Sequence, residues 1–159
     1  VHQHQATLAT PPPDVAGTDE VTELPHGDAG ALVAIDRAAS GMDRSRLLET
    51  LRATGQFVVT GSPGRPSGYA CVRRWGRGCV LGPVIATDER AARALVASAL
   101  RHRAGEFVRI DVTENSGLSP WLESLGLPCV DRVTSMARGA LPQHASHDRL
   151  FALASQSLG

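Results

Sequence analysis

From residue 78 to residue 138 the chain alternates short apolar runs with amphipathic segments, and this alternation constrains the fold more than any other feature. Runs typical of strands lie at 78–86, 107–112 and around 129–138. The segment 87–105 carries alanine, leucine and valine at three- and four-residue spacing, with Thr87 or Asp88 as N-cap and Gly105 as its end. A β-α-β-α-β order of this kind predicts helices packed on one central sheet.

The strand at 107–112 is followed by a second amphipathic segment, which we expect to form a helix over 115–125. Asn115 is a good N-cap residue, and Gly126 suits a left-handed turn into the next strand. The residues expected on the buried face of this helix are Leu118, Trp121, Leu122 and Leu125.

Upstream of this alternation the pattern predicts two helices and two strands. The helices lie at 28–39 and 43–54, and the strands at 56–61 and 68–75. A tight connection over 75–78 predicts a hairpin with the strand 78–86. A short C-terminal helix at 147–156 completes an α+β (mixed α/β) fold, with a central, mostly antiparallel sheet flanked by helices.

Residues 1–19 differ in character from the rest of the chain. They contain three successive prolines and almost no apolar periodicity. This composition predicts a disordered or loosely docked leader, followed by one domain over 20–159.

Composition narrows the class of protein. A chain of 159 residues can bury about two thirds of its unfolded surface as a single domain. Sixteen basic and sixteen acidic residues cancel, so no net charge favours nucleic acid or an anionic membrane as a partner. No apolar run reaches membrane-spanning length, and the N-terminus does not resemble a signal peptide, so we expect a cytoplasmic protein. Three scattered cysteines predict neither a metal site nor a disulfide framework.

Five segments resemble, in order and spacing, the GNAT superfamily of N-acetyltransferases, and more narrowly the C-terminal half of a bacterial tandem GNAT group. They read AIDRAASGMDRSRLLETL, SGYACVRR, LGPVIATDERAARALVASAL, RIDVTENSGLSPWLESLGL and RVTSMARG. In that family, one helix follows a loose pattern. An asparagine is followed by a small residue at +3, a tyrosine at +7, and Gly-Phe at +11 and +12. The corresponding residues here are Asn115, Leu118, Leu122, Gly126 and Leu127.

The resemblance implies an N-acetyltransferase that uses acetyl-CoA as co-substrate and transfers its acetyl group to a primary amine. The acceptor would be a small molecule or a protein, and a second copy or an upstream GNAT half is the expected protein partner. By resemblance, pantetheine binds at the splayed end of the strand 78–86, and the pyrophosphate binds at the start of the next helix. The residues implied for acetyl-CoA binding are Val84, Ile85, Ala86, Thr87, Arg90, Ala91, Ala92 and Asn115.

The sequence departs from the family pattern at these sites. The usual phosphate loop reads Arg/Gln-x-x-Gly-x-Gly/Ala, whereas the matching positions here are Thr87, Arg90 and Ala92. Arg90 adds bulk where glycine permits close approach, and it also adds a cation that can pair with phosphate. Leu122 replaces a tyrosine that commonly protonates the departing thiolate. Loss of such a group costs on the order of 10²–10⁴ in rate unless another donor replaces it.

Two carboxylates, Asp111 and Glu114, are the candidates for a general base, because they lie at the end of the strand 107–112. The favoured alternative for both is a solvated charge, or a pairing with Arg109. Asp36 and Arg44 match the acceptor side of the tandem group and are also explained as helix-surface charge. The alternative function is a non-catalytic GNAT-like accessory or dimerisation domain, or a fragment of a tandem enzyme.

Overall fold

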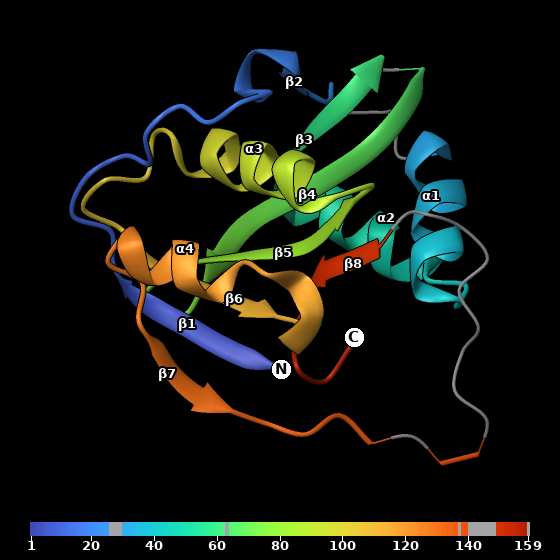
Figure 1. Ribbon diagram of the computed structural model, residues 1–159. Coiled ribbons are helices and arrows are strands. Elements are labelled where there is room, and N and C mark those ends of the chain that lie inside the picture. The colour runs from blue at the N-terminus through green and yellow to red at the C-terminus, as the bar shows by residue number, and fades with distance from the viewer. Residues whose placement is uncertain (26–29, 63, 137, 140–148, 159) are drawn as a thin grey trace.

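The computed structural model describes residues 1–25, 30–62, 64–136, 138–139 and 149–158 (Figure 1). Its strands are β1 (His2–Thr7), β2 (Val21–Glu23), β3 (Gly55–Ser62), β4 (Arg65–Trp75), β5 (Gly78–Ala86), β6 (Phe107–Val112), β7 (Cys129–Arg132) and β8 (Arg149–Ala152). Its α-helices are α1 (Gly30–Ser40), α2 (Ser45–Thr54), α3 (Glu89–Leu100) and α4 (Ser119–Ser124). Two 3₁₀ turns are η1 (Thr18–Glu20) and η2 (Glu114–Ser116).

Within these residues the strands form one eight-stranded sheet in the order β2-β3-β4-β5-β8-β6-β1-β7. β5 and β6 are parallel, and the other pairings among described strands are antiparallel. The predicted hairpin between β4 and β5 is confirmed. The expected mixed fold, a largely antiparallel sheet flanked by helices, is therefore confirmed.

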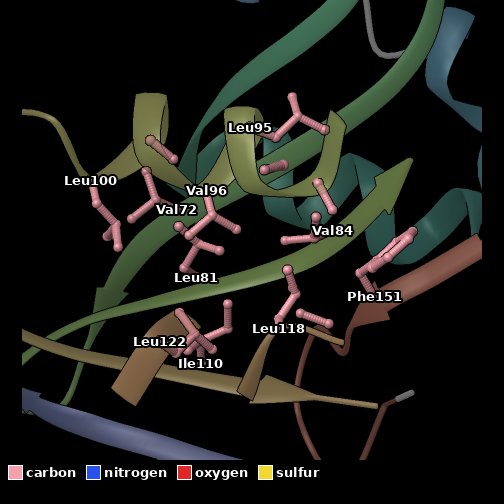
Figure 2. Close-up of a cluster of buried hydrophobic side chains, with 14 of the residues drawn as sticks. Val72, Leu81, Val84, Leu95, Val96, Leu100, Ile110, Leu118, Leu122 and Phe151 are labelled. Atoms are coloured by element: carbon pink, nitrogen blue, oxygen red, sulfur yellow. The ribbon is translucent and has the colours of Figure 1, made fainter. Parts of the chain in front are cut away.

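The helices cover the two faces of the sheet in pairs. α3 and α4 pack on one face, in a cluster that includes Val72, Leu81, Leu95 and Leu122 (Figure 2). α1 and α2 pack on the other face, against the residues of β3, β4 and β5 that point the opposite way. These are Phe57, Val59, Tyr69, Cys71 and Ile85. No helix in the described part of the chain has the length and apolar character that a membrane crossing demands.

The helix predicted over 87–105 is confirmed as α3, and it is shorter than predicted. Its N-cap is Asp88, whose carboxylate accepts a hydrogen bond from the backbone N–H of Ala91 (2.8 Å). The helix ends at Leu100, and Gly105 follows a turn with φ +82°. The first two helices are also confirmed, except that residues 28 and 29 lie outside the described residues.

The prediction of a disordered leader over residues 1–19 is wrong. β1 pairs with β6 from His2–Val112 to Thr7–Phe107, and with β7 on its other side. His4 is fully buried, and its Nδ1 donates to the carbonyl oxygen of Leu127 (2.8 Å). Backbone pairing on both sides and a buried Leu8 stabilise this strand. The polar side chains of the segment conceal it, because local pattern records burial and not backbone partners.

The helix predicted over 115–125 is divided by Gly117, whose φ of +74° interrupts it. Asn115 lies inside η2, so its assignment as an N-cap is wrong. The α-helix begins only at Ser119, and the Ser116 hydroxyl accepts a hydrogen bond from the N–H of Leu118 (3.2 Å). Gly126 does adopt the predicted left-handed turn, with φ +79°.

Of two predictions near the C-terminus, the first is confirmed only in part and the second is wrong. The strand expected around 129–138 ends at Arg132. The helix expected over 147–156 is not formed: Arg149–Ala152 is the strand β8, residues 153–156 are neither helix nor strand, and residues 147 and 148 lie outside the described residues. Four apolar or amphipathic residues fit either period, and the backbone edges of β5 and β6 decide in favour of a strand.

Candidate functional site

The parallel strands β5 and β6 separate near the middle of the sheet (Figure 1). They pair from Cys79–Val108 to Leu81–Ile110, and the pairing stops there. Gly82 follows with φ +150°, and the peptide bond between Gly82 and Pro83 is cis. Beyond Leu81 the second half of β5 no longer pairs with β6, which leaves a gap between the two strands.

β8 occupies that gap. On one side it pairs antiparallel with β5, through Ala152–Val84, Leu150–Ile85 and Arg149–Ala86. On the other side the N–H of Thr113 donates to the carbonyl oxygen of Phe151 (2.9 Å), and the N–H of Leu153 donates to that of Asp111 (2.8 Å). The gap between the diverging strands is therefore closed by the chain itself.

Two residues of the core sheet fit closely against the inserted segment. A Cβ at Gly82 would collide with the carbonyl oxygen of Leu153, so only glycine permits this approach. Arg73 on β4 donates to the carbonyl oxygens of both Gly82 (2.7 Å) and Ala154 (2.6 Å). The Arg73 guanidinium thus joins Gly82 in β5 to the end of the inserted segment.

Of the residues implied for acetyl-CoA binding, Val84, Ile85 and Ala86 line this gap from β5 and are fully buried. Their backbone edge is paired with β8. Asn115 lies beside the N-terminal end of β8, where its carbonyl oxygen accepts a hydrogen bond from Arg149 (2.7 Å). These four residues lie around the gap.

The remaining implied residues lie at the start of α3. Thr87 and Arg90 are exposed, Ala91 is half-buried, and Ala92 is fully buried in the core. The N–H of Ala91 is taken by the Asp88 carboxylate, and that of Ala92 bonds to the Asp88 carbonyl oxygen (3.0 Å). Arg90 turns toward η1 and pairs with Glu20 (3.4 Å). A phosphate at this helix end would have to displace one carboxylate.

The two candidate bases differ in their surroundings. Asp111 is 1% exposed and accepts three hydrogen bonds from Arg109, with Nη2–Oδ2 at 2.9 Å. Glu114 is exposed on η2. Leu122 is fully buried in the core cluster beneath α4 (Figure 2). The pairing of Asp111 with Arg109, an alternative that the sequence left open, is the arrangement observed.

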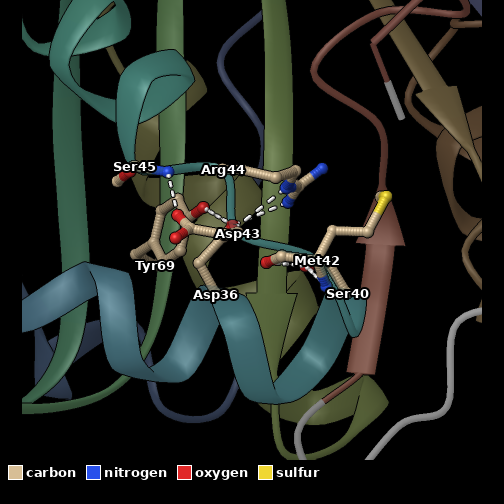
Figure 3. A network of polar contacts seen from close by, with 7 residues as sticks. All are labelled: Asp36, Ser40, Met42, Asp43, Arg44, Ser45 and Tyr69. Atoms are coloured by element: carbon tan, nitrogen blue, oxygen red, sulfur yellow. Dashed lines mark hydrogen bonds and ion pairs between the residues drawn. The ribbon is translucent and has the colours of Figure 1, made fainter.

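Asp36 and Arg44 form a buried network beneath α1 and α2 (Figure 3). Arg44 donates through Nε and Nη2 to the two carboxylate oxygens of Asp36 (3.0 and 2.6 Å), and Tyr69 donates its hydroxyl to Asp36 (2.5 Å). Burial and the nearby Asp36 carboxylate raise the pKa of Tyr69 well above its usual 10.0. These residues join α1, α2 and β4, and neither charge is the helix-surface charge that the sequence suggested.

A cavity of about 430 Å³ lies elsewhere in the described part of the molecule. It is formed by the beginning of β3 and the C-terminal ends of α2 and α3, and none of its lining residues belongs to β5, β6 or β8. Sequence reasoning missed the gap-filling segment and Arg73. No local signal marks Arg73, because its partners are backbone carbonyls 9 and 81 residues away.

A largely antiparallel sheet containing one diverging parallel pair, with helices in pairs on its two faces, defines the architectural class of this protein. Residues 32–152, well over half of the chain, match the sequence model of the acetyltransferase (GNAT) domain. The chain belongs to this GNAT acetyltransferase-domain family. Comparison with curated proteins finds no match.

Solved structures share this fold. The whole chain matches 52% of an assigned acetyltransferase from Pyrococcus horikoshii, with 18% identity and a TM-score of 0.69. A GCN5-related N-acetyltransferase from Sphaerobacter thermophilus matches over 80% of this chain and 47% of its own length, with 17% identity and a TM-score of 0.55. The chain therefore spans about half the length of each of these structural relatives.

Proposed function

We propose that this domain transfers an acetyl group from acetyl-CoA to a primary amine. The observation that carries the proposal is the parallel β5–β6 pair, which separates beyond Leu81 in a member of the GNAT family. By family resemblance, the pantetheine arm would enter between the separating strands. The acceptor is a small molecule or a protein amine.

The reaction would proceed by attack of the neutral amine on the thioester carbonyl. The carbon–nitrogen bond forms, the carbon–sulfur bond breaks, and coenzyme A leaves as a thiol after taking up a proton. A backbone N–H of β5 near Val84 would stabilise the oxyanion. Glu114 is the better-placed base, because it is exposed, whereas the Asp111 carboxylate is saturated by Arg109.

Protonation of the leaving thiolate requires a donor other than the residue at 122. Leu122 carries no proton and is fully buried among apolar side chains. Water at the mouth of the gap can serve instead, at a cost in rate of up to about 10²–10⁴ relative to a positioned acid. We therefore expect slow turnover.

A second candidate function is that of a non-catalytic accessory domain paired with an upstream GNAT half. Three observations favour it: β8 fills the gap, the Asp88 carboxylate occupies the start of α3, and Leu122 is buried. The chain also spans about half of its structural relatives. The partner would then supply the acetyl-CoA site.

Isothermal titration with acetyl-CoA separates the two candidates. N-Acetyl transfer requires binding, with release of a free thiol when a mixture of primary amines is added. Coenzyme A alone should stabilise the fold in a thermal-shift assay. The accessory function predicts neither binding nor stabilisation, and no binding at millimolar ligand would exclude the enzymatic proposal for this domain.

A further inference from the structure

We propose that β8 and the two residues after it act as an intramolecular competitor of acetyl-CoA, closing the gap until the ligand displaces them. The inference rests on the proposed function, because it assigns acetyl-CoA to the gap between β5 and β6. What it adds is a closed state held by residues of the same chain.

The backbone edges that line the gap are already paired. β5 is engaged over Val84–Ala86, and β6 through the carbonyl oxygen of Asp111. A pantetheine arm that lies between these strands needs the same N–H and carbonyl groups. Because each N–H donates one hydrogen bond, ligand and strand exclude one another at this position.

The segment is also buried in the core on both faces of the sheet. Phe151 is fully buried in the cluster that contains Val84 and Leu118, and Figure 2 shows it on β8 near the end of β5. Ala154 is fully buried in the cluster beneath α1 and α2. The segment therefore fills the gap as a packed strand and not as a loosely resting tail.

The inserted segment is short, and specific side-chain contacts hold both of its ends. β8 is four residues long. Two residues beyond its C-terminal end, the carbonyl oxygen of Ala154 accepts a hydrogen bond from Arg73. At its near end Arg149 bonds to the carbonyl oxygen of Asn115. All of these contacts are non-covalent, so the strand can exchange with a ligand, and the apparent affinity for that ligand is multiplied by the fraction of chains that are open.

The main experiment compares two shortened chains with the complete one. One ends at Asp148 and lacks β8, and its matched control ends at Ser155 and keeps the whole segment. Titration with acetyl-CoA should show affinity about tenfold or more higher for the chain ending at Asp148, corresponding to a closed fraction of about nine tenths or more. The control should bind like the complete chain.

A synthetic peptide of residues 149–155, RLFALAS, supplies the segment in trans. Added to the chain ending at Asp148, it should lower the apparent affinity for acetyl-CoA in a competitive manner. A scrambled peptide of the same composition should have no effect.

A second variant keeps the chain intact, in case the shortened chain fails to fold. Arg73→Met removes the bonds to Gly82 and Ala154 and should raise acetyl-CoA affinity severalfold, because the closed state is weakened. Arg74→Met is its control, since Arg74 loses the same charge from the adjacent, exposed position. On acetyl-CoA binding, the amide protons of Thr113 and Leu153 should exchange faster with solvent.

The outcomes separate this inference from the proposed function. Equal acetyl-CoA affinity in the complete chain and the chain ending at Asp148, with Arg73→Met also unchanged, overturns the competitor and leaves the function standing. A shortened chain that binds the peptide but not acetyl-CoA overturns the function itself, and the competitor with it.

Discussion

At the scale of single residues, the buried Asp36–Arg44–Tyr69 network makes the sharpest demand on the sequence. Asp36 is 1% exposed, and it is held by one guanidinium and one hydroxyl. A buried charge is tolerated only while its partner remains. The network therefore fixes how α1 and α2 pack on β4. Removing the cation alone and removing both charges should lower the free energy of unfolding by different amounts.

Arg44→Met should destabilise the fold by about 3–5 kcal/mol, because it leaves the Asp36 carboxylate buried without its cation. Adding Asp36→Asn to the same chain should recover part of that loss, since the buried charge is gone. Urea unfolding curves of the two variants and the parent measure both effects. A loss below about 1 kcal/mol for Arg44→Met would mean that the pair is screened as on a surface.

Cys71 predicts how stability depends on alkaline pH. Burial raises the pKa of the Cys71 thiol from 9.0 to about 12, and Arg73 opposes the shift weakly. The unfolded chain therefore loses this proton first. The protonated Cys71 thiol therefore contributes fully to the free energy of unfolding below pH 9. This contribution, about 4 kcal/mol in total, is lost as pH rises toward 12.

The pKa of Tyr69 is also raised in the folded chain, so the Tyr69 hydroxyl ionises first in the unfolded chain. The free energy of unfolding therefore falls further above pH 10. Urea unfolding between pH 8 and pH 11 should therefore show a steep alkaline decline in the parent chain. Cys71→Ala should flatten the decline that begins near pH 9. Cys129→Ala, at a partly exposed position, should keep it. Identical slopes in the two variants would contradict the assignment to Cys71.

At the scale of elements, the sequence predicts well the helices and strands that have their own period and caps. α3 has an apolar stripe, an N-cap and a glycine beyond its end, and it was placed almost correctly. β1 and β8 were missed because each is short and is stabilised by strands far away in sequence. The N-cap prediction at Asn115 is wrong because the sequence does not show whether Gly117 lies inside the helix or before it. In the structure Gly117 has a positive φ and precedes the α-helix.

The candidate site also contains features that the sequence predicts and features that it does not. Val84, Ile85, Ala86 and Asn115 all lie beside β8, and their assignment to acetyl-CoA stays a prediction. What fills the gap could not be predicted, because the pairing of β8 depends on edges that exist only after β5 and β6 diverge. The Asp88 cap was predictable from α3 alone, and its consequence for phosphate binding follows from the carboxylate.

The role of β1 as an internal strand predicts a large effect at Leu8. Leu8 is fully buried and pairs through its backbone with Gly105 and Glu106. Leu8→Ala should cost about 2–5 kcal/mol, the range for a buried leucine. Leu158→Ala, at a position 54% exposed, should change stability by no more than about 0.5 kcal/mol. Equal urea midpoints for the two variants would show that the segment is docked only loosely.

At the scale of the whole molecule, the first and last described strands are both inserted into the half of the sheet beyond β5 (Figure 1). β1 completes the connection between β6 and β7, and β8 closes the gap between β5 and β6. Pairings between residues more than a hundred positions apart slow folding, because loop closure precedes the contact. The central hairpins and α3 should therefore form before β1 is inserted.

Acetyl-CoA is strongly anionic, whereas this chain has no net charge, so local charges decide whether the ligand's phosphates are accepted. The helix end at α3 attracts anions, but the Asp88 carboxylate already occupies it through the N–H of Ala91. Asp88→Ser keeps a capping oxygen and removes the charge, so stability should change by only a few tenths of a kcal/mol. Affinity for acetyl-CoA should rise severalfold, and the gain should shrink at high salt as screening weakens the original repulsion. Asp131→Ser makes the same change in net charge on β7 and serves as the control in the same titrations. An equal gain in both variants would trace the effect to net charge alone, and no gain in either would place the phosphates away from α3.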